Sequence, residues 1–232
     1  MPFLIVFCLV SMVVMAVLWR RQRALRRDAY IRSFTLPIGL FEGLRKRHPA
    51  LTLKECQLVA HGLRQFFLTH LKSGRQFVSM PSQVADDLWH EFILHTRAYQ
   101  AFCENAFGRF FHHTPAVVLG DSKQSNAGLR RCWWFACREE NIDPRAPTRL
   151  PLLFALDAKL AITGGFQYAA DCDTMRRLGT SSSAVVHCGS DFSSASIDGG
   201  TDGFGDGSSG DGGGDGGGDS GGGGCGGGGG GD

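Results

Sequence analysis

The sequence lacks basic residues over its last quarter and lacks charged residues at its start. No Lys or Arg follows Arg177, and residues 2–19 contain no charged side chain. The net charge of +2 is the sum of two regions of opposite net charge. Residues 1–177 carry 24 basic and 14 acidic side chains, whereas residues 178–232 carry eight Asp and no basic residue. This division excludes one uniform globule extending over the whole chain.

Glycine is scarce outside one segment. Of the 33 glycines, 22 lie between Gly199 and Gly231, and they follow no Gly-X-Y period, which excludes collagen. Residues 179–232 consist mainly of Ser, Gly and Asp and offer too little apolar surface to offset the entropy of ordering. We therefore expect an acidic, Gly/Asp/Ser-rich disordered tail.

The uncharged start of the chain predicts a transmembrane anchor over residues 1–19. Pro2 to Trp19 has Ser11 as its only polar side chain, and 18 residues of helix rise about 27 Å, close to the roughly 30 Å hydrocarbon core. A cleaved signal peptide is the competing interpretation. It fits less well, because no basic residue precedes the apolar run and no small-x-small site follows it.

A basic juxtamembrane segment, residues 20–33, follows the anchor and predicts its orientation. Basic residues that flank a membrane span stay on the cytoplasmic side, so we expect the N-terminus outside and the remaining chain in the cytoplasm. Anionic lipid headgroups are the expected partners of these side chains. The arginines concerned are Arg20, Arg21, Arg23, Arg26 and Arg27.

Two common functional signatures are missing from the chain. The eight cysteines include no Cys-x-x-Cys pair, and no Walker A sequence is present. In a reducing cytosol, irregularly spaced cysteines are expected as free thiols, several of them acting as small buried apolar residues. Neither a disulfide framework nor a phosphate-binding loop is predicted.

Residues 34–178 have the size of one ordinary domain, and their apolar residues recur mostly at helical spacing. The pattern predicts an all-α fold of about five helices between the anchor and the tail. The helices are expected over residues 36–46, 53–72, 81–107, 127–140 and 150–160.

The predicted helix over residues 81–107 carries an unusual polar stripe. At 100° per residue, Asp86, His90 and Arg97 fall within about 40° of one another, opposite a broad apolar arc that includes Trp89. Asp86 and His90 have i, i+4 spacing and can touch. Because Ile and Leu border the stripe, we expect a cleft formed by Asp86, His90, Arg97 and Trp89.

Three interpretations of this stripe remain open. Asp86, His90, His112 and His113 form a plausible oxygen and nitrogen ligand set for a divalent metal, the one possible cofactor. Alternatively, Asp86 fixes His90 in a structural hydrogen bond, or the stripe recognises a peptide or other partner. His95 cannot share an ion with His90, because the i, i+5 spacing separates their directions by about 140°.

The same residues also carry a family resemblance. The run Asp86-x-x-Trp89-His90, followed by Tyr99, Cys103 and His112-His113, resembles the glycine-rich domain-containing proteins, in particular bacterial membrane-anchored members. The resemblance implies the helical fold and the anchor-plus-tail layout but no particular reaction. Many eukaryotic relatives have a second histidine two positions after the first, where this chain has Phe92.

The sequence therefore favours a non-enzymatic binding or scaffolding module on a membrane, with an unknown protein partner. A metal-dependent enzyme or metal-binding protein that uses Asp86, His90, His112 and His113 is the alternative. Nucleic acid is not an expected partner, because the aromatic residues beside Arg130-Arg131 fall on a helical core stripe and Glu139-Glu140 offset the charge.

Overall fold

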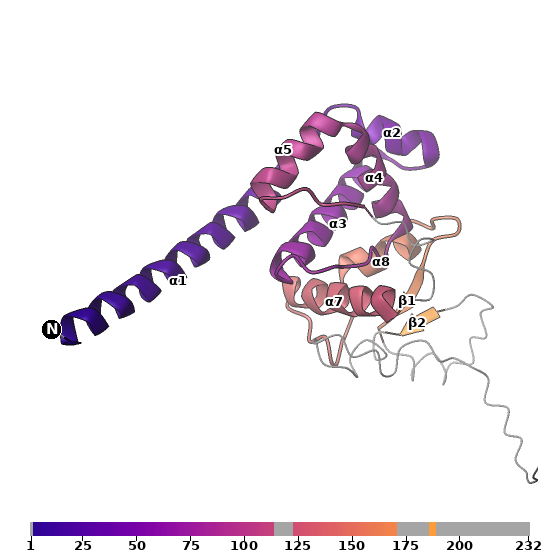
Figure 1. Cartoon of the computed structure of the whole chain (residues 1–232). Helices are drawn as coiled ribbons and strands as arrows, with labels where there is room; N and C mark the ends of the chain where they lie inside the picture. The colour runs from indigo at the N-terminus through magenta and orange to yellow at the C-terminus, as the bar shows by residue number, and fades with distance from the viewer. Residues whose placement is uncertain (1, 114–122, 171–185, 189–232) are drawn as a thin grey trace, which may run out of the picture.

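The computed structural model describes residues 2–113, 123–170 and 186–188. The described part is mostly helical, with a long N-terminal helix standing out from a globular domain (Figure 1). The predicted tail and the boundary region before it lie largely outside the described residues. The elements are α1 (Pro2–Ser33), α2 (Leu40–Arg47), α3 (Leu53–Lys72), α4 (Gln83–Leu94), α5 (Thr96–Ala106), α7 (Lys123–Glu139), α8 (Leu152–Lys159), β1 (Gln167–Ala169) and β2 (Val186–Cys188).

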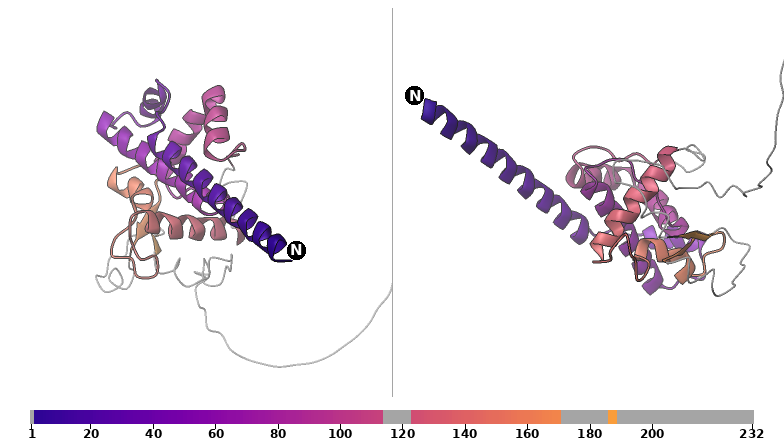
Figure 2. Two further views of the ribbon diagram at one scale, coloured as in Figure 1. Left: turned by 90° about the vertical axis from the view of Figure 1, so that its left-hand side faces the viewer. Right: turned by 90° about the horizontal axis from the view of Figure 1, so that it is seen from below.

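Helix α1 joins the apolar segment and the basic segment without interruption. It is long and apolar enough to cross a membrane, with a mean hydropathy of 2.5 in its most apolar window and none of that window buried. No Gly or Pro occurs between Phe3 and Leu36, so nothing in the sequence favours a break. The two further views show the same straight projection (Figure 2).

The last turn of α1 belongs to the domain core. Ile31 is fully buried, and the ring of Phe34, just beyond the helix, lies 4.8 Å from that of Phe102 on α5. Tyr30 packs on the same residue at 6.0 Å. The basic segment is therefore a rigid connection and not a loose linker.

Helix α3 forms the centre of the domain and confirms the predicted helix over residues 53–72. Its N-terminus has a capping box, in which Thr52 Oγ1 accepts from Glu55 N–H and the Glu55 carboxylate accepts from Thr52 N–H. Phe66 and Phe67 are buried beneath α4 and α5. Gly62 allows α8 to approach closely, because Leu156 occupies the place that a Cβ at position 62 would take.

The predicted helix over residues 81–107 is two helices, so the expectation of one continuous helix is wrong. The chain breaks at His95, which caps both α4 and α5 with a non-helical backbone (φ −80°, ψ 60°). The break lets the Tyr99 ring pack against Phe92 at 5.2 Å, and Trp89 Nε1 donate to Tyr99 Oη at 3.1 Å. In a straight helix, positions 89 and 99 would lie about 15 Å apart along the axis.

Side chains distant in sequence cap the N-termini of α4 and α8. The buried Asp157 carboxylate of α8 accepts from Ser82 Oγ at 2.7 Å and from the N–H groups of Gln83 and Val84 at 2.7 and 3.2 Å. The Glu140 carboxylate accepts from Leu152 N–H at 2.5 Å, at the start of α8. Each cap satisfies N–H groups that a helix cannot pair internally.

The short strands were not predicted. β1 and β2 pair in parallel, with Tyr168 opposite His187. β2 lies beyond residue 178, so the described structure continues past the boundary expected from the sequence. Strands of three residues are too short to show an alternating pattern.

The described cysteines of the domain are structural. Cys56, Cys103, Cys132 and Cys137 are buried free thiols. Burial raises the pKa of both Cys132 and Cys137 to about 12, which keeps these two thiols protonated and unreactive.

His70 makes the stability of the domain dependent on pH. It is buried, its ring stacks on Phe111 at 3.8 Å, and its Nδ1 lies 3.0 Å from Gln76 O. The pKa of His70 is lowered to about 4, mainly by burial and also by the charges of Arg109 and Arg75, whereas the hydrogen bond with Gln76 O opposes the shift. The unfolded chain, with a His pKa of 6.5, therefore binds the proton more tightly than the folded chain.

We therefore expect the free energy of unfolding to be nearly constant above pH 6.5 and to fall by about 2 kcal/mol between pH 7 and pH 5 because of His70 alone. Urea unfolding of the full chain in detergent, at a series of pH values, measures this loss. His70→Gln removes the titrating group, so its curve should fall less over the same range. An equal fall in both proteins would assign the pH dependence to carboxylates instead.

Candidate metal centre

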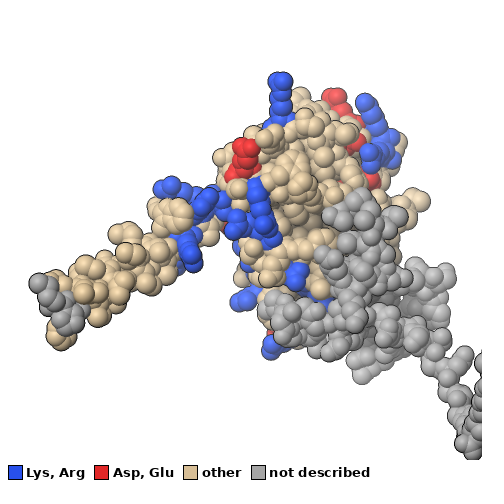
Figure 3. Space-filling model, viewed as in Figure 1, with Lys and Arg blue, Asp and Glu red and all other residues tan. Residues whose placement is uncertain are grey.

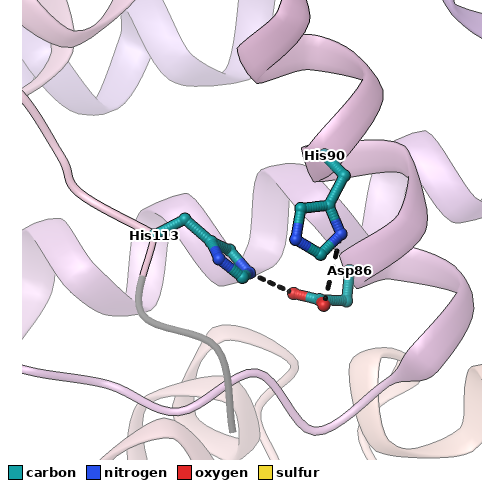
Figure 4. Close-up of side chains that lie close together, drawn as sticks. All are labelled: Asp86, His90 and His113. Atoms are coloured by element: carbon teal, nitrogen blue, oxygen red, sulfur yellow. Dashed lines mark hydrogen bonds and ion pairs between the residues drawn. The ribbon is translucent and has the colours of Figure 1, made fainter. Parts of the chain in front are cut away.

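Helix α4 presents Asp86 and His90 on the side opposite its core contacts. Leu88, Trp89 and Phe92 are buried, whereas the side chains of Asp86 and His90 are 23% and 38% exposed. The i, i+4 spacing brings the two polar side chains together, with His90 Nδ1 3.5 Å from Asp86 Oδ2 (Figure 4). The predicted contact is confirmed.

The third member of the cluster comes from the segment that follows α5. Gly108, with φ +74°, ends α5 by donating its N–H to Cys103 O and Glu104 O at 3.0 and 2.9 Å. The chain then runs back along α4 and brings His113 Nε2 to 2.8 Å from Asp86 Oδ1. The His113 side chain is only 11% exposed.

His112 does not join the cluster, although the sequence analysis included it. Residues 110–113 form neither helix nor strand, and their burial alternates along the segment. Phe111 is buried and His113 is partly buried, whereas His112 is exposed and contacts the ring of Phe110 at 4.8 Å. The alternation thus selects one of the two adjacent histidines for the cluster.

Arg97 also lies outside the cluster. Because the helix breaks at His95, Arg97 belongs to α5, where it is exposed, and no longer continues the stripe of Asp86 and His90. Trp89 is present as expected, but as a buried support whose ring lies 4.6 Å from the His113 ring. The cluster is therefore made of Asp86, His90 and His113, with Trp89 beneath it.

A buried hydrogen-bond chain fixes the segment that carries His113. Tyr99 Oη accepts from Trp89 Nε1 and donates to Phe111 O at 2.5 Å. Burial raises the pKa of Tyr99, so its hydroxyl remains a donor. Cys103 packs beside it, with its thiol near Tyr99 and Phe111. In the sequence analysis Tyr99 and Cys103 appear only as residues of the family resemblance, and their positioning role was not predicted.

The neighbouring carboxylate, Asp87, has a different task. Its oxygens lie 2.9 Å from Arg47 Nη1 and 2.8 Å from His48 Nε2, which connects α4 to the end of α2. Asp87 is thus neutralised by structural partners. Asp86, one residue earlier, has only the two histidines as described ionic partners.

The geometry of the cluster suits a transition-metal ion. One carboxylate oxygen and two imidazole nitrogens, one from each residue, lie within 4.8 Å of one another, and the His90 and His113 ring centroids are 4.2 Å apart. A tetrahedral site with bonds of about 2.1 Å separates its ligand atoms by roughly 3.4 Å. The upper limit of 4.8 Å on the separations of the three ligand atoms leaves room for such an ion after small side-chain adjustments.

Comparisons with known proteins place the chain in a family. No curated protein and no solved structure matches it. A family model described as UCP032817-like matches residues 26–192, which include the end of α1, every domain helix and the cluster of Asp86, His90 and His113. The comparisons identify no glycine-rich domain. The match covers well over half of the sequence, and the chain belongs to the UCP032817-like family.

Proposed function

We propose that this chain is a membrane-anchored protein whose helical domain binds a divalent transition-metal ion through Asp86, His90 and His113. The observation that carries the proposal is the convergence of these three side chains from α4 and the segment after α5, with one ligand atom of each within 4.8 Å of the others. His113 joins Asp86 and His90 only because the chain folds back after Gly108.

The ligand types support a particular class of metal. Ca²⁺ and Mg²⁺ prefer sets made only of oxygen ligands, whereas imidazole nitrogens favour Zn²⁺, Fe²⁺, Ni²⁺ or Cu²⁺. Two histidines with one carboxylate are three protein ligands, which leave at least one position for water or another ligand. The partial exposure of His90, at 38%, is consistent with access from solvent.

A protein that binds a metal ion in this way is a binding module, and no reaction is required of it. An ion with an open position on an anchored domain can serve in metal storage or delivery, or in recognition of a metal-binding partner. The alternative expected from the sequence, a metal-dependent enzyme, would use the same ion to polarise a substrate or to activate water. Both rest on the same metal site, and metal occupancy is therefore tested first.

Elemental analysis of the full chain, purified in detergent after supply of Zn²⁺, Fe²⁺ or Ni²⁺, tests the site. We expect about one ion per wild-type chain, and far less in His90→Ala and in His113→Ala, because each variant removes one of three ligands.

Two exposed histidines outside the cluster provide matched controls. His95→Ala and His112→Ala each remove an imidazole that lies near the cluster but outside it. Both variants should retain the wild-type metal content. A wild-type chain without metal, or equal metal content in all four variants, would contradict the proposal. In that event the hydrogen bond from His113 to Asp86 would favour the metal-free scaffold instead.

We infer that α1 spans a bacterial inner membrane with its N-terminus outside and the domain in the cytoplasm. The support is the position of the five arginines directly after the apolar segment. The resemblance to glycine-rich domain-containing proteins is consistent with this layout. It adds no ligand, so the metal proposal stands on the geometry alone.

A further inference from the structure

Arginines from three separate segments gather where α1 enters the domain. Basic side chains are concentrated at this junction on the face shown in Figure 3. Four arginines around Gly108 define the site, here called the junction arginines. They are Arg23 and Arg27 of α1, Arg75 after α3 and Arg109 after α5.

Direct contacts hold these side chains together. Arg27 occupies the place that a Cβ at position 108 would take, and Arg23 Nη2 lies 3.6 Å from the same point. Arg75 Nη1 donates to Phe107 O at 3.0 Å, and Arg109 Nη2 donates to Arg75 O at 2.5 Å. Gly108 is favoured by its positive φ, and it leaves space into which the end of the Arg27 side chain fits.

The charge of the junction arginines is not neutralised within the described part of the chain. No described carboxylate forms an ion pair with any of the four, whereas the nearby Arg32 and Lys72 both pair with Asp28 and Glu139. Burial lowers the pKa of Arg27, and repulsion from Arg23 and Arg75 lowers it further. Like charges held this close are stabilised when an anion binds between them.

The position along α1 indicates the source of that anion. Trp19 ends the apolar segment, and Arg23 lies over its ring at 5.3 Å. Arg23 and Arg27 follow Trp19 by about 6 and 12 Å along the helix, and the headgroup layer extends roughly 5–8 Å beyond the hydrocarbon core. Long arginine side chains can reach back into this layer.

We propose that Arg23, Arg27, Arg75 and Arg109 together form a binding site for the phosphate group of an anionic membrane lipid. Planar guanidinium groups match phosphate oxygens in pairs. The arginines of α1 alone would give a general attraction to a negative surface. Arg75 and Arg109 add a defined binding site to this general attraction, because they hold a bound headgroup against the domain.

Lipid binding to the full chain in a zwitterionic detergent, followed by native mass spectrometry, tests the proposal. The probes are phosphatidylglycerol and, for comparison, phosphatidylcholine. We expect the wild type to bind phosphatidylglycerol more tightly than phosphatidylcholine. Arg75→Gln with Arg109→Gln should weaken that binding about 30-fold, since each arginine near an anionic surface contributes roughly a factor of five.

Arg45→Gln with Arg97→Gln removes the same charge from exposed positions on α2 and α5 and should leave lipid binding unchanged. Circular dichroism reports the folding of each variant, and Arg27→Gln replaces the double variant if the latter unfolds. Equal binding of both lipids, or equal losses in the site and control variants, would overturn the proposal. Displacement of phosphatidylglycerol by an equal concentration of inorganic phosphate would overturn the assignment to a lipid.

Discussion

Asp86→Asn is expected to lower the affinity for a divalent transition metal at least about 100-fold, because partners outside the ligand set alone change metal affinity 10- to 100-fold. Asp86 is the only carboxylate of the cluster and lies between both histidines, 2.8 Å from His113 and 3.5 Å from His90. The neutral amide keeps the shape of the side chain. It removes the negative charge that would offset part of the charge of the ion.

The adjacent residue gives the matched comparison. Asp87→Asn should leave metal affinity within a few-fold of the wild type and lower the free energy of unfolding by about 1 kcal/mol, because the buried Asp87 carboxylate bonds to His48 and to the half-exposed Arg47. Isothermal titration with Zn²⁺ and urea unfolding measure the two effects. Similar loss of metal affinity in both variants would mean that the charge of α4, and not coordination by Asp86, governs binding.

Asp157→Ala is expected to cause the largest loss of stability, about 4 kcal/mol, because buried donors left without an acceptor cost roughly 1–3 kcal/mol each. Asp157 is 1% exposed, and its oxygens accept hydrogen bonds from Ser82, Gln83, Val84 and Phe166. The first turn of α4 would lose its cap. Since Asp86 lies in that turn, metal affinity should fall as well.

Urea unfolding of the full chain in detergent measures this loss. Asp143→Ala is the control, because Asp143 is exposed and accepts one local hydrogen bond from Arg145 N–H. Its effect should stay within about 0.5 kcal/mol, as for most surface substitutions. A comparable loss of unfolding free energy in the two variants would show that Asp157 contributes no more to stability than a surface carboxylate does.

The sequence was sufficient to predict helices whose limits are determined by residues close to them in the chain. Thr52 and Glu55 form a capping box at the predicted start of α3, and Ser73-Gly74 follows its end, so both limits could be predicted. The break at His95 could not, because no Gly or Pro interrupts the apolar stripe. The break is stabilised by tertiary contacts of Tyr99 with Trp89 and Phe92, and such contacts override local helix propensity.

The candidate site was predicted in part for the same reason. Asp86 and His90 touch within one helix, and helical spacing alone indicates their contact. The choice between His112 and His113 depends on which side of the segment after α5 faces α4. Phe110 and Phe111 are both phenylalanines, so the sequence gives no preference for either side. The burial of Phe111 against Trp89 and His70 decides it.

Because α1 runs unbroken into the core, the rotation of its apolar part about the helix axis is coupled to the orientation of the domain. Each residue of an α-helix turns the chain by 100° and advances it by 1.5 Å. One residue added between Trp19 and Ile31 would rotate the cluster of Asp86, His90 and His113 by about 100°, a little more than a quarter turn, around the helix axis. If α1 crosses a membrane as proposed, the length of this connection would set both the direction in which the domain faces and its height above the bilayer.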